Sequence, residues 1–456
     1  MADAELLLHE LFSHKSWRSG QQHVVKAVLQ KQDVLLDWPT GAGKSLCYQL
    51  PAVLAWRRHG GVAVVVEPLI SLMRDQVLNF NRLYADAGEG PQATYLGSSQ
   101  SDVSMELRAL AGEFCLVYVT PEKLTERLLE GLEPLHRTGR LEMVVMDEAA
   151  CISLWGHDFR PSFRNMWWVR ERYPEVPFMA LSGSMTDGMR RDISEQLRLR
   201  DPVVSTLPYF RPNLDITCTH KEGFIQDMAR IAEALKPGEL TIIYTPKLST
   251  AYKVAVKLES LLKDQGVQVG VYTGPTEKAE RERVQSMFDS DEIQVLVATV
   301  AFGMGIDKAD VRNIIHYGLP KCMEDYHQQI GCAGRDSLPS QCVIMFSNTD
   351  WKVWFCRYFT KEYKHWDKED LKTHLDSTEQ LHQLVVGHTC RQQAILEYFG
   401  HMDEVELLRC GSLCRCDVCL GRRGQWFGGK EPRDFFREAR LVLEAVSVAE
   451  GLSRGR

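Results

Sequence analysis

The chain has 456 residues, which is too long for one hydrophobic core and predicts two or three domains. Its composition, 44% hydrophobic and 25% charged, is ordinary for a globular protein, and no apolar run approaches the roughly 18 residues that a membrane span needs. The net charge of −7 argues against a general polyanion binder, so any nucleic-acid surface must be local.

Near the N-terminus, the segment Trp17-Arg18-Ser19-Gly20-Gln21 places an aromatic ring, a cation and an amide close together. Such a set of side chains could read a purine base. An ordinary surface loop has the same composition, so both interpretations stay open for these residues alone.

The next predicted strand, at residues 34–36, runs into Thr40-Gly41-Ala42-Gly43-Lys44-Ser45 and then into a helix. This context matches the GKS end of a phosphate-binding loop, although the first glycine of the usual pattern is absent. Glycines let backbone N–H groups curl round phosphates, and the helix N-terminus adds a favourable dipole. Lys44 would reach the β- and γ-phosphates, and the Ser45 hydroxyl would bind Mg²⁺. We therefore predict that this loop binds a nucleotide through Thr40, Gly41, Gly43, Lys44 and Ser45.

The apolar run at residues 143–146 ends in two carboxylates, Asp147 and Glu148. An uninterrupted apolar run favours a strand buried on both faces of a parallel sheet, and open α/β sheets bind ligands at the carboxyl ends of their strands. With a phosphate-binding loop upstream, Asp147 is the expected second partner of Mg²⁺, and Glu148 would orient the attacking water. The alternative is a hydrogen-bonded turn without a catalytic role.

The loop after these carboxylates interleaves aromatic rings with charged side chains. Aromatic rings beside a cation can stack bases and hold phosphates. The residues that we predict to contact DNA are Trp155, His157, Phe159 and Arg160.

Further strands alternate with helical segments, which predicts doubly wound parallel sheets. The first set of predicted strands also includes residues 62–66, 116–119 and 178–181, and the second set spans 241–244, 267–272, 295–298 and 313–316. The character of the sequence changes around residues 206–212. We expect an ATP-binding α/β domain over residues 1–206 and a second α/β domain over 207–350.

The second α/β domain carries arginine and glutamine in a polar loop at residues 328–336. Such a domain can close on a nucleotide that the first domain holds. Arg335 would then act as an arginine finger that stabilises charge on the γ-phosphate, and Gln328 would lie at the same edge.

Most of the 13 cysteines are scattered singly through apolar segments, as in a reducing compartment, but one group differs. Cys390 opens a predicted helix, and Cys416-x-x-Cys419 follows in a closely spaced set. This pattern fits a structural Cys₄ zinc site, with Cys414 or Cys410 as the fourth ligand. Unligated cysteines are the alternative. We expect a helical zinc-binding subdomain over residues 351–425 and a tail over 426–456 that contains an amphipathic helix.

Together these segments resemble the RecQ family of superfamily 2 DNA helicases, and most closely its Werner-type branch. The most specific signals are CISLWGHDFRP, PLISLMRDQV, AFGMGIDKADVR and the CRQ…CDVC module, and the similarity covers nearly the whole chain. The resemblance implies two RecA-like lobes, a zinc-binding platform and 3′→5′ unwinding of DNA driven by ATP and Mg²⁺. The implied partner is single-stranded and forked or branched duplex DNA.

The resemblance also assigns individual residues. Arg18 and Gln21 would contact the adenine, and His14 would occupy the position of a residue that stacks on it. The implied location is the nucleus in a eukaryote and the cytoplasm otherwise. The last predicted helix resembles the first helix of a winged-helix domain.

Three departures from the family pattern affect the prediction. The DEAH box reads Asp147-Glu148-Ala149-Ala150, the TAT-type motif reads Ser182-Gly183-Ser184, and one arginine of GRAGRDG is replaced by Cys332. Removing a cation that faces the γ-phosphate can lower the rate on the order of 10³-fold in related NTPases. The alternative function is therefore a DNA-binding or regulatory relative that binds ATP but hydrolyses it poorly.

Overall fold

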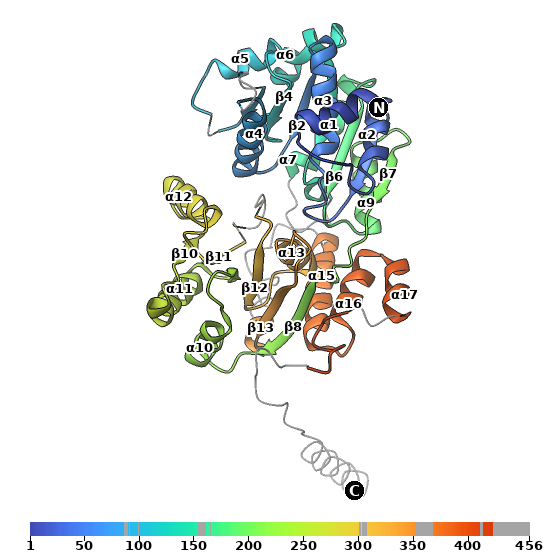
Figure 1. Cartoon of the computed structure of the whole chain (residues 1–456). Coiled ribbons are helices and arrows are strands. Elements are labelled where there is room, and N and C mark those ends of the chain that lie inside the picture. Colours follow the sequence, from blue (N-terminus) through green and yellow to red (C-terminus); the bar gives the residue numbers. More distant parts are fainter. Residues whose placement is uncertain are drawn as a thin grey trace, which may run out of the picture.

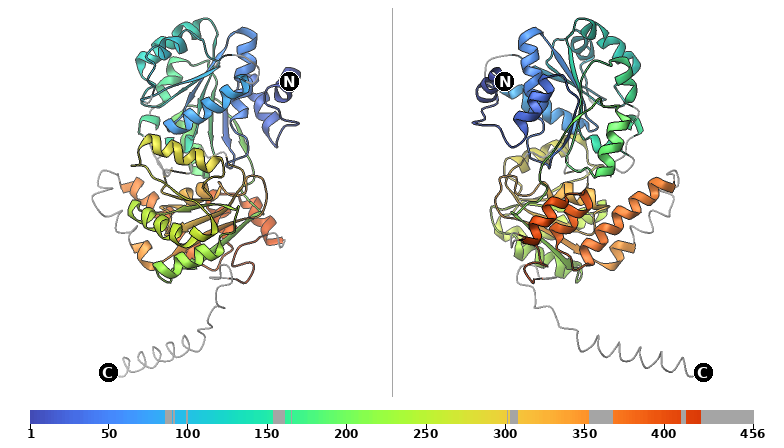
Figure 2. Two further views of the ribbon diagram at one scale, coloured as in Figure 1. Left: turned by 60° about the vertical axis from the view of Figure 1, so that its left-hand side comes forward. Right: turned by 90° about the vertical axis from the view of Figure 1, so that its right-hand side faces the viewer.

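The structure, a computed structural model, describes residues 1–85, 90, 92–98, 100–153, 161–164, 166–300, 302, 308–352, 368–410 and 414–422. Two α/β lobes are stacked one above the other, and a group of helices packs against the second lobe (Figures 1 and 2). The predicted amphipathic helix of the tail lies outside the described residues. No helix in the described part of the chain is long and apolar enough to cross a membrane.

The first lobe is built on a seven-stranded sheet with the strand order β3-β4-β2-β5-β6-β1-β7. Its strands are β1 (Val34–Asp37), β2 (Val62–Val66), β3 (Ala93–Leu96), β4 (Leu116–Val119), β5 (Leu141–Met146), β6 (Phe178–Ser182) and β7 (Val203–Thr206). Its helices are α1 (Ala2–Glu10), α2 (Gln21–Leu29), α3 (Leu46–His59), α4 (Ile70–Ala85), α5 (Met105–Leu110), α6 (Glu126–Arg137), the 3₁₀ turn η1 (Ala149–Ile152), α7 (Pro161–Arg164), α8 (Trp167–Arg172) and α9 (Asp187–Gln196).

The second lobe is built on a six-stranded sheet with the order β10-β11-β9-β12-β13-β8. Its strands are β8 (Leu214–His220), β9 (Leu240–Tyr244), β10 (Val269–Tyr272), β11 (Val295–Ala298), β12 (Val311–Tyr317) and β13 (Ser340–Phe346). Its helices are α10 (Phe224–Ala234), α11 (Leu248–Leu262), η2 (Lys263–Gln265), α12 (Lys278–Asp289) and α13 (Met323–Ile330). Every neighbouring pair of described strands in both sheets is parallel, as predicted.

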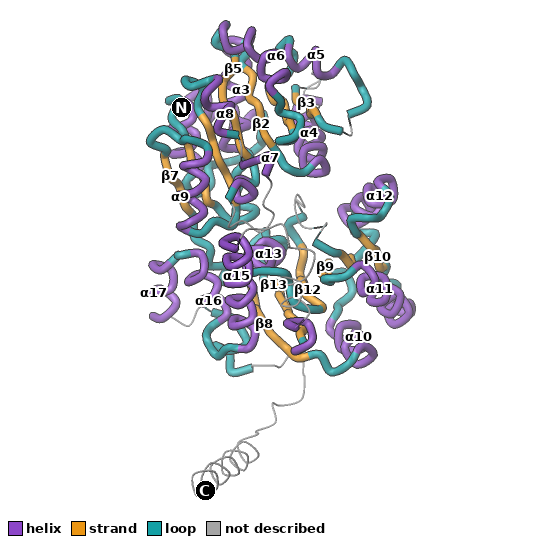
Figure 3. Tube along the Cα trace, turned by 180° about the vertical axis from the view of Figure 1, so that it is seen from behind, coloured by secondary structure: helices purple, strands orange, loops and turns teal. Residues whose placement is uncertain are grey.

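Apolar runs in the central strands supply a core on each face of the sheet. All six residues of β5 are buried. Val145 belongs to the core that holds α2, α3 and α4, whereas its neighbour Val144 belongs to the core that holds α6 and α9. This is because successive side chains of a strand point to opposite faces, and parallel sheets carry helices on both. Helices flank both sheets when the molecule is seen from behind (Figure 3).

The helices that follow the second sheet share its hydrophobic core. These helices are α15 (Lys368–Val386), α16 (Arg391–Phe399) and α17 (Met402–Cys410). Leu396, Phe399 and Cys416 lie in the same apolar cluster as Ile216 of β8 and Ile344 of β13. The helical region is therefore packed as an extension of the second lobe.

The sequence predicted the central strands better than the edges. Residues 62–66, 116–119 and 295–298 form strands with the predicted bounds. The sequence analysis did not predict β3, β7, β8 or β13, and three of these, β3, β7 and β8, lie at a sheet edge.

A buried carboxylate fixes the start of β1, the strand that leads to the phosphate-binding loop. Asp33 accepts hydrogen bonds from Arg170 Nη2 at 2.6 Å, from the backbone N–H of Phe178 at 2.8 Å and from that of Arg200 at 2.7 Å. Its side chain and that of Arg170 are nearly inaccessible to solvent, at 0% and 6% exposure. A carboxylate in such a place must be paired, because an isolated buried charge is strongly unfavourable.

We expect Asp33→Ala to destabilise the first lobe by about 3–5 kcal/mol, because it leaves the buried Arg170 guanidinium without its partner. Urea unfolding followed by circular dichroism measures this. The control is Asp3→Ala, which removes an exposed partner of Arg58 and should unfold at the wild-type urea concentration. Equal midpoints for the two variants would contradict this role for Asp33.

Candidate nucleotide and metal sites

A cleft of about 400 Å³ lies where the two lobes meet. Residues of the first lobe form most of its wall, and Arg335 enters it from the second lobe. The predicted nucleotide-site residues that line it are His14, Arg18, Gln21, Thr40, Gly41, Gly43, Lys44, Ser45, Asp147, Glu148 and Arg335. His14 and Arg335, which are 321 positions apart in the chain, thus line one cavity.

The phosphate-binding loop has the backbone conformation that its glycines permit. Gly41 and Gly43 have φ of +83° and +84°, in the left-handed region that favours glycine. A Cβ atom on Gly43 would lie 2.6 Å from the side-chain nitrogen Nε2 of Gln21, so the close approach of Gln21 to the loop also favours glycine there. Lys44 Nζ donates a hydrogen bond to the backbone carbonyl of Trp38 at 3.0 Å. Burial lowers the pKa of Lys44, and the charges of Glu148 and Asp147 oppose this shift.

The two predicted catalytic carboxylates follow β5 at the carboxyl edge of the first sheet. Burial and the adjacent charge of Glu148 raise the pKa of Asp147 to about 7, and Lys44 opposes the rise. Asp147 Oδ1 accepts a hydrogen bond from the Glu148 N–H at 3.0 Å. Glu148 has φ of +48°, an uncommon conformation for a residue with a side chain, of a kind that clusters at active sites.

The N-terminal segment is fastened to the phosphate-binding loop. Gln21 is 2% exposed, and its Nε2 donates to the carbonyl of Gly43 at 3.1 Å. Arg18 Nη1 donates to the carbonyl of Gly41 at 2.8 Å. Burial lowers the pKa of His14, and the charge of Arg18 adds to this effect. Arg18 and Gln21 therefore contact the phosphate-binding loop. Because Gln21 is buried, the alternative of an ordinary surface loop does not hold for this residue.

Arg335 reaches the cleft from the amino edge of the second sheet. It follows α13 and precedes β13, and the N–H of the adjacent Gly334 donates to the carbonyl of Val311, the first residue of β12. A Cβ atom on Gly41 would lie 3.3 Å from Arg335 Cδ, so the arginine packs on the phosphate-binding loop. Gln328, predicted to act beside Arg335, is not among the residues that line the cleft.

The walls of the cleft also include residues that the sequence analysis did not assign, mostly from α4. Two of its residues contact the second lobe across the cleft: Arg74 pairs with Glu282 of α12, and Asp75 accepts from Gln285 Nε2 at 3.1 Å. Asp75 also lines the cleft. The signal for this helix was the PLISLMRDQV motif, which indicated a family but no side-chain role.

Of the three departures in the motifs, neither Ala150 nor Cys332 lines the cleft. Ala150 is 1% exposed in the apolar core of the first lobe. Cys332 is fully buried in the core of the second lobe, 3.7 Å from Arg335 Nη2 and 3.9 Å from the carbonyl of Gln328. The thiol thus lies beneath the arginine rather than facing the phosphate-binding loop.

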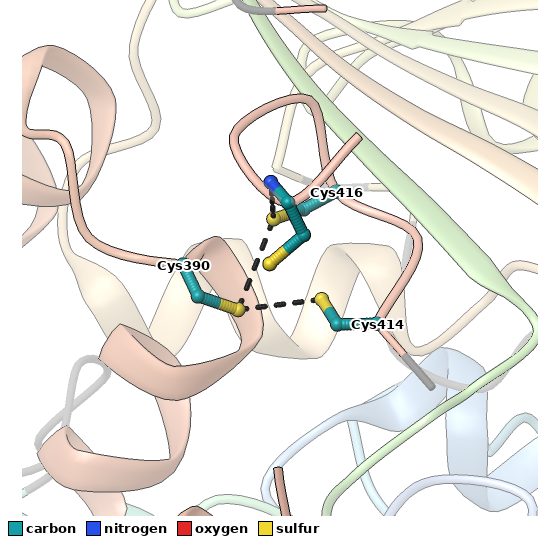
Figure 4. A group of neighbouring side chains, drawn as sticks. Cys390, Cys414 and Cys416 are labelled. Atoms are coloured by element: carbon teal, nitrogen blue, oxygen red, sulfur yellow. Dashed lines mark hydrogen bonds between the residues drawn. The ribbon is translucent and has the colours of Figure 1, made fainter. Parts of the chain in front are cut away.

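Four cysteine sulfurs converge beside α16. The Sγ atoms of Cys390, Cys414, Cys416 and Cys419 all lie within 4.8 Å of one another. Those of Cys390 and Cys414 are 3.3 Å apart, and those of Cys390 and Cys416 are 3.8 Å apart (Figure 4). Sulfurs at 2.3 Å from one tetrahedral zinc ion would be about 3.8 Å apart, and a disulfide is near 2 Å, so the spacing fits a metal site. Cys414 therefore supplies the fourth sulfur among the described side chains.

Hydrogen bonds outside the cysteine cluster hold it against the second sheet. Arg391 follows Cys390 and pairs with Asp417, Nε to Oδ1, at 2.9 Å, with 1% and 0% of the two side chains exposed. The Asp417 N–H donates to the carbonyl of Ile216 at 2.9 Å, and its Oδ2 accepts from the Cys218 N–H at 3.2 Å. The cysteine loop thus covers β8, an edge strand whose backbone groups would otherwise be unpaired.

The four residues predicted to contact DNA, Trp155, His157, Phe159 and Arg160, lie outside the described part of the chain.

Comparisons with known proteins agree with this architecture. Residues 18–191 match the DEAD/DEAH box helicase family, residues 225–337 the helicase conserved C-terminal domain, and residues 355–420 the RecQ zinc-binding family. The chain is 36% identical over 460 residues to the ATP-dependent DNA helicase RecQ of Bacillus subtilis, with 97% of this chain and 70% of that protein covered. The RecQ protein of Pasteurella multocida is 35% identical over 425 residues, with 92% of this chain and 63% of that protein covered.

A solved structure of Mycobacterium smegmatis helicase Lhr, bound to ssDNA and AMP-PNP, has a TM-score of 0.61 at 16% identity and covers 86% of this chain and 55% of that one. This likeness shows the fold alone. The DEAD/DEAH box and helicase C-terminal matches, one on each parallel-sheet lobe, identify a superfamily 2 helicase core. With the zinc-binding match, the chain belongs to the RecQ family. The chain spans 63% of the length of the Pasteurella relative and 32% of a Schizosaccharomyces pombe relative.

We expect the wild-type chain to purify with one zinc ion, and Cys416→Ser to lose it, because a structural zinc site needs all four ligands. Metal analysis by mass spectrometry measures this, and the variant should also be cleaved faster by protease beyond residue 386, since zinc binding contributes to folding. The control is Cys342→Ala, a buried cysteine on β13 outside the cluster, which should keep its zinc. Wild-type protein without metal would contradict the assignment.

Proposed function

We propose that this chain is the core of an ATP-dependent DNA helicase that translocates 3′→5′ on single-stranded DNA and unwinds duplexes, forked or branched ones included. The observation that carries the proposal is the cleft itself. One lobe contributes a phosphate-binding loop and two carboxylates, and the other contributes one arginine. Hydrolysis in such a cleft depends on how closely the lobes approach, which is how a nucleotide can drive relative motion of two domains.

Each side chain in the cleft has a chemical role in the proposed reaction. Lys44 and the backbone of Gly41 and Gly43 bind the phosphates, and the Ser45 hydroxyl and Asp147 hold Mg²⁺, which neutralises charge on the β- and γ-phosphates. Glu148 orients the attacking water, and Arg335 stabilises the charge that develops on the γ-phosphate. His14, Arg18 and Gln21 form the end of the cleft nearest α2 and would contact the adenine.

Zinc in the cysteine cluster would have a structural role. Four sulfurs and no other ligand from the described residues fit the closed coordination of structural sites, whereas catalytic sites keep a position open.

The alternative, a relative that binds ATP but hydrolyses it poorly, rests on Ala150 and Cys332. Both residues are packed in apolar cores, and the cleft keeps Lys44, both carboxylates and Arg335. We therefore retain hydrolysis as the proposed activity.

Lys44→Ala should abolish ATP hydrolysis without unfolding the protein, because it removes a phosphate-binding charge from a loop. Phosphate release is measured with and without single-stranded DNA, and circular dichroism checks the fold. The control is Lys26→Ala, an exposed lysine on α2 that should leave turnover unchanged. Wild-type turnover in the Lys44 variant would remove the assignment of the loop.

Trp155→Ala should lower DNA-stimulated turnover far more than basal turnover, because the proposed loop links DNA to the nucleotide site. Single-strand affinity should fall as well, since stacking of a base on an aromatic ring contributes roughly 1–3 kcal/mol. Fluorescence anisotropy with a labelled oligonucleotide and the ATPase assay give the two readouts. Equal loss of basal and stimulated turnover would indicate a packing role.

A further inference from the structure

The segment that joins the two lobes, residues 207–213, contacts both halves of the nucleotide cleft. It begins where β7 ends and stops where β8 begins. On the first-lobe side, the Tyr209 hydroxyl donates a hydrogen bond to Asp37, and the Leu207 N–H donates to the carbonyl of Asp37 at 3.2 Å. Asp37 is the last residue of β1, which continues through Trp38 and Pro39 into the phosphate-binding loop.

On the second-lobe side, the same segment holds the loop that carries Arg335. Arg211 Nη2 donates to the carbonyls of Ala333 at 2.9 Å and Gly334 at 2.7 Å. Asn213 Nδ2 also donates to the carbonyl of Gly334, at 2.9 Å. These carbonyls immediately precede Arg335, so the linker fixes the backbone from which the arginine extends.

The linker is also bound by α16 and α17, which we call the zinc-binding helices. Glu404 of α17 accepts hydrogen bonds from the N–H groups of Tyr209 at 2.9 Å and Phe210 at 2.8 Å. Gln392 of α16 is 3% exposed and donates to the carbonyl of Arg211 at 3.0 Å. His401 stacks on the Tyr209 ring at 4.1 Å between centroids and pairs with Glu404 at 2.9 Å. A linker with so many fixed backbone groups is a defined spacer rather than a flexible tether.

The second lobe completes the enclosure of Tyr209. His327 of α13 stacks on the tyrosine ring with centroids 4.8 Å apart and planes 13° apart. A Cβ atom on Gly331, at the end of α13, would lie 3.3 Å from Thr40 Cβ, so the helix end touches the phosphate-binding loop. One tyrosine thus contacts the first lobe, the second lobe and the zinc-binding helices.

We propose that the linker, held by Glu404 and Gln392 of the zinc-binding helices, sets the position of Arg335 against the phosphate-binding loop, with Tyr209 and Arg211 as positioning residues. The inference rests on the proposed ATP hydrolysis and adds a role for the zinc-binding helices in it. Because an arginine finger acts on the transition state, misplacing it lowers kcat and leaves the affinity for ATP unchanged.

The test compares Glu404→Ala with Glu406→Ala, an exposed glutamate on the same helix. We expect Glu404→Ala to lower kcat by at least about tenfold while the Kd for a fluorescent ATP analogue changes by less than about twofold, and Glu406→Ala to change neither. Zinc content and melting temperature are measured for both. If Glu404→Ala loses zinc, Tyr209→Phe replaces it, because that change removes only the hydroxyl bonded to Asp37 and should give the same split.

A second experiment tests whether the loss of kcat depends on Arg335. In an Arg335→Ala background, Glu404→Ala and Tyr209→Phe should have little further effect on kcat, because residues that act through one group are non-additive. A further loss by the same factor, or an unchanged kcat in the single variants, would overturn the inference. A different result would contradict the proposed function: equal rates of ATP hydrolysis by the wild-type and Arg335→Ala proteins.

Discussion

The arrangement of the molecule depends on one buried carboxylate, Asp37, at the end of the strand that carries the phosphate-binding loop. It has no exposed surface, and two partners from distant parts of the chain, Arg190 and Tyr209, bind its two oxygens. Burial raises the pKa of Asp37, and the hydrogen bond from Tyr209 and the charge of Arg190 oppose the rise. A buried carboxylate without partners is strongly unfavourable, and here each oxygen of Asp37 has one. The first lobe, the linker and the phosphate-binding loop are thereby fixed at one point.

The loop that carries the cysteine cluster covers one edge of the second sheet. β8 is an edge strand with a polar, alternating sequence, and such strands can pair with other chains. Asp417 bonds to the backbone of β8 on both sides of Thr217, and the buried Arg391 neutralises its charge. Cys416 is adjacent to Asp417 on this loop, so fixing the cysteines also keeps the loop on the edge strand.

Much of the fold and the cleft could be predicted from the sequence, because the relevant signals are local. Continuous apolar runs gave β2, β4 and β11 with their bounds, and the glycine-rich loop gave residues that line the cleft. The edge strand β7 alternates partly buried and exposed residues and has no buried apolar run, which is why it was not predicted. The contact between Asp37 and Tyr209 spans 172 residues, and a pairing of that kind leaves no local pattern. Spacing could not choose Cys414 over Cys410, because both are close enough in sequence to reach the other three.

The cleft joins unlike parts of the two lobes: the loops after β1 and β5 on one side, and the segment between α13 and β13 on the other. Such a contact is heterologous: it joins two different surfaces and contains no two-fold axis. A polymer lying across both lobes would therefore meet two different surfaces in a fixed order, and reversing it would change its contacts with both.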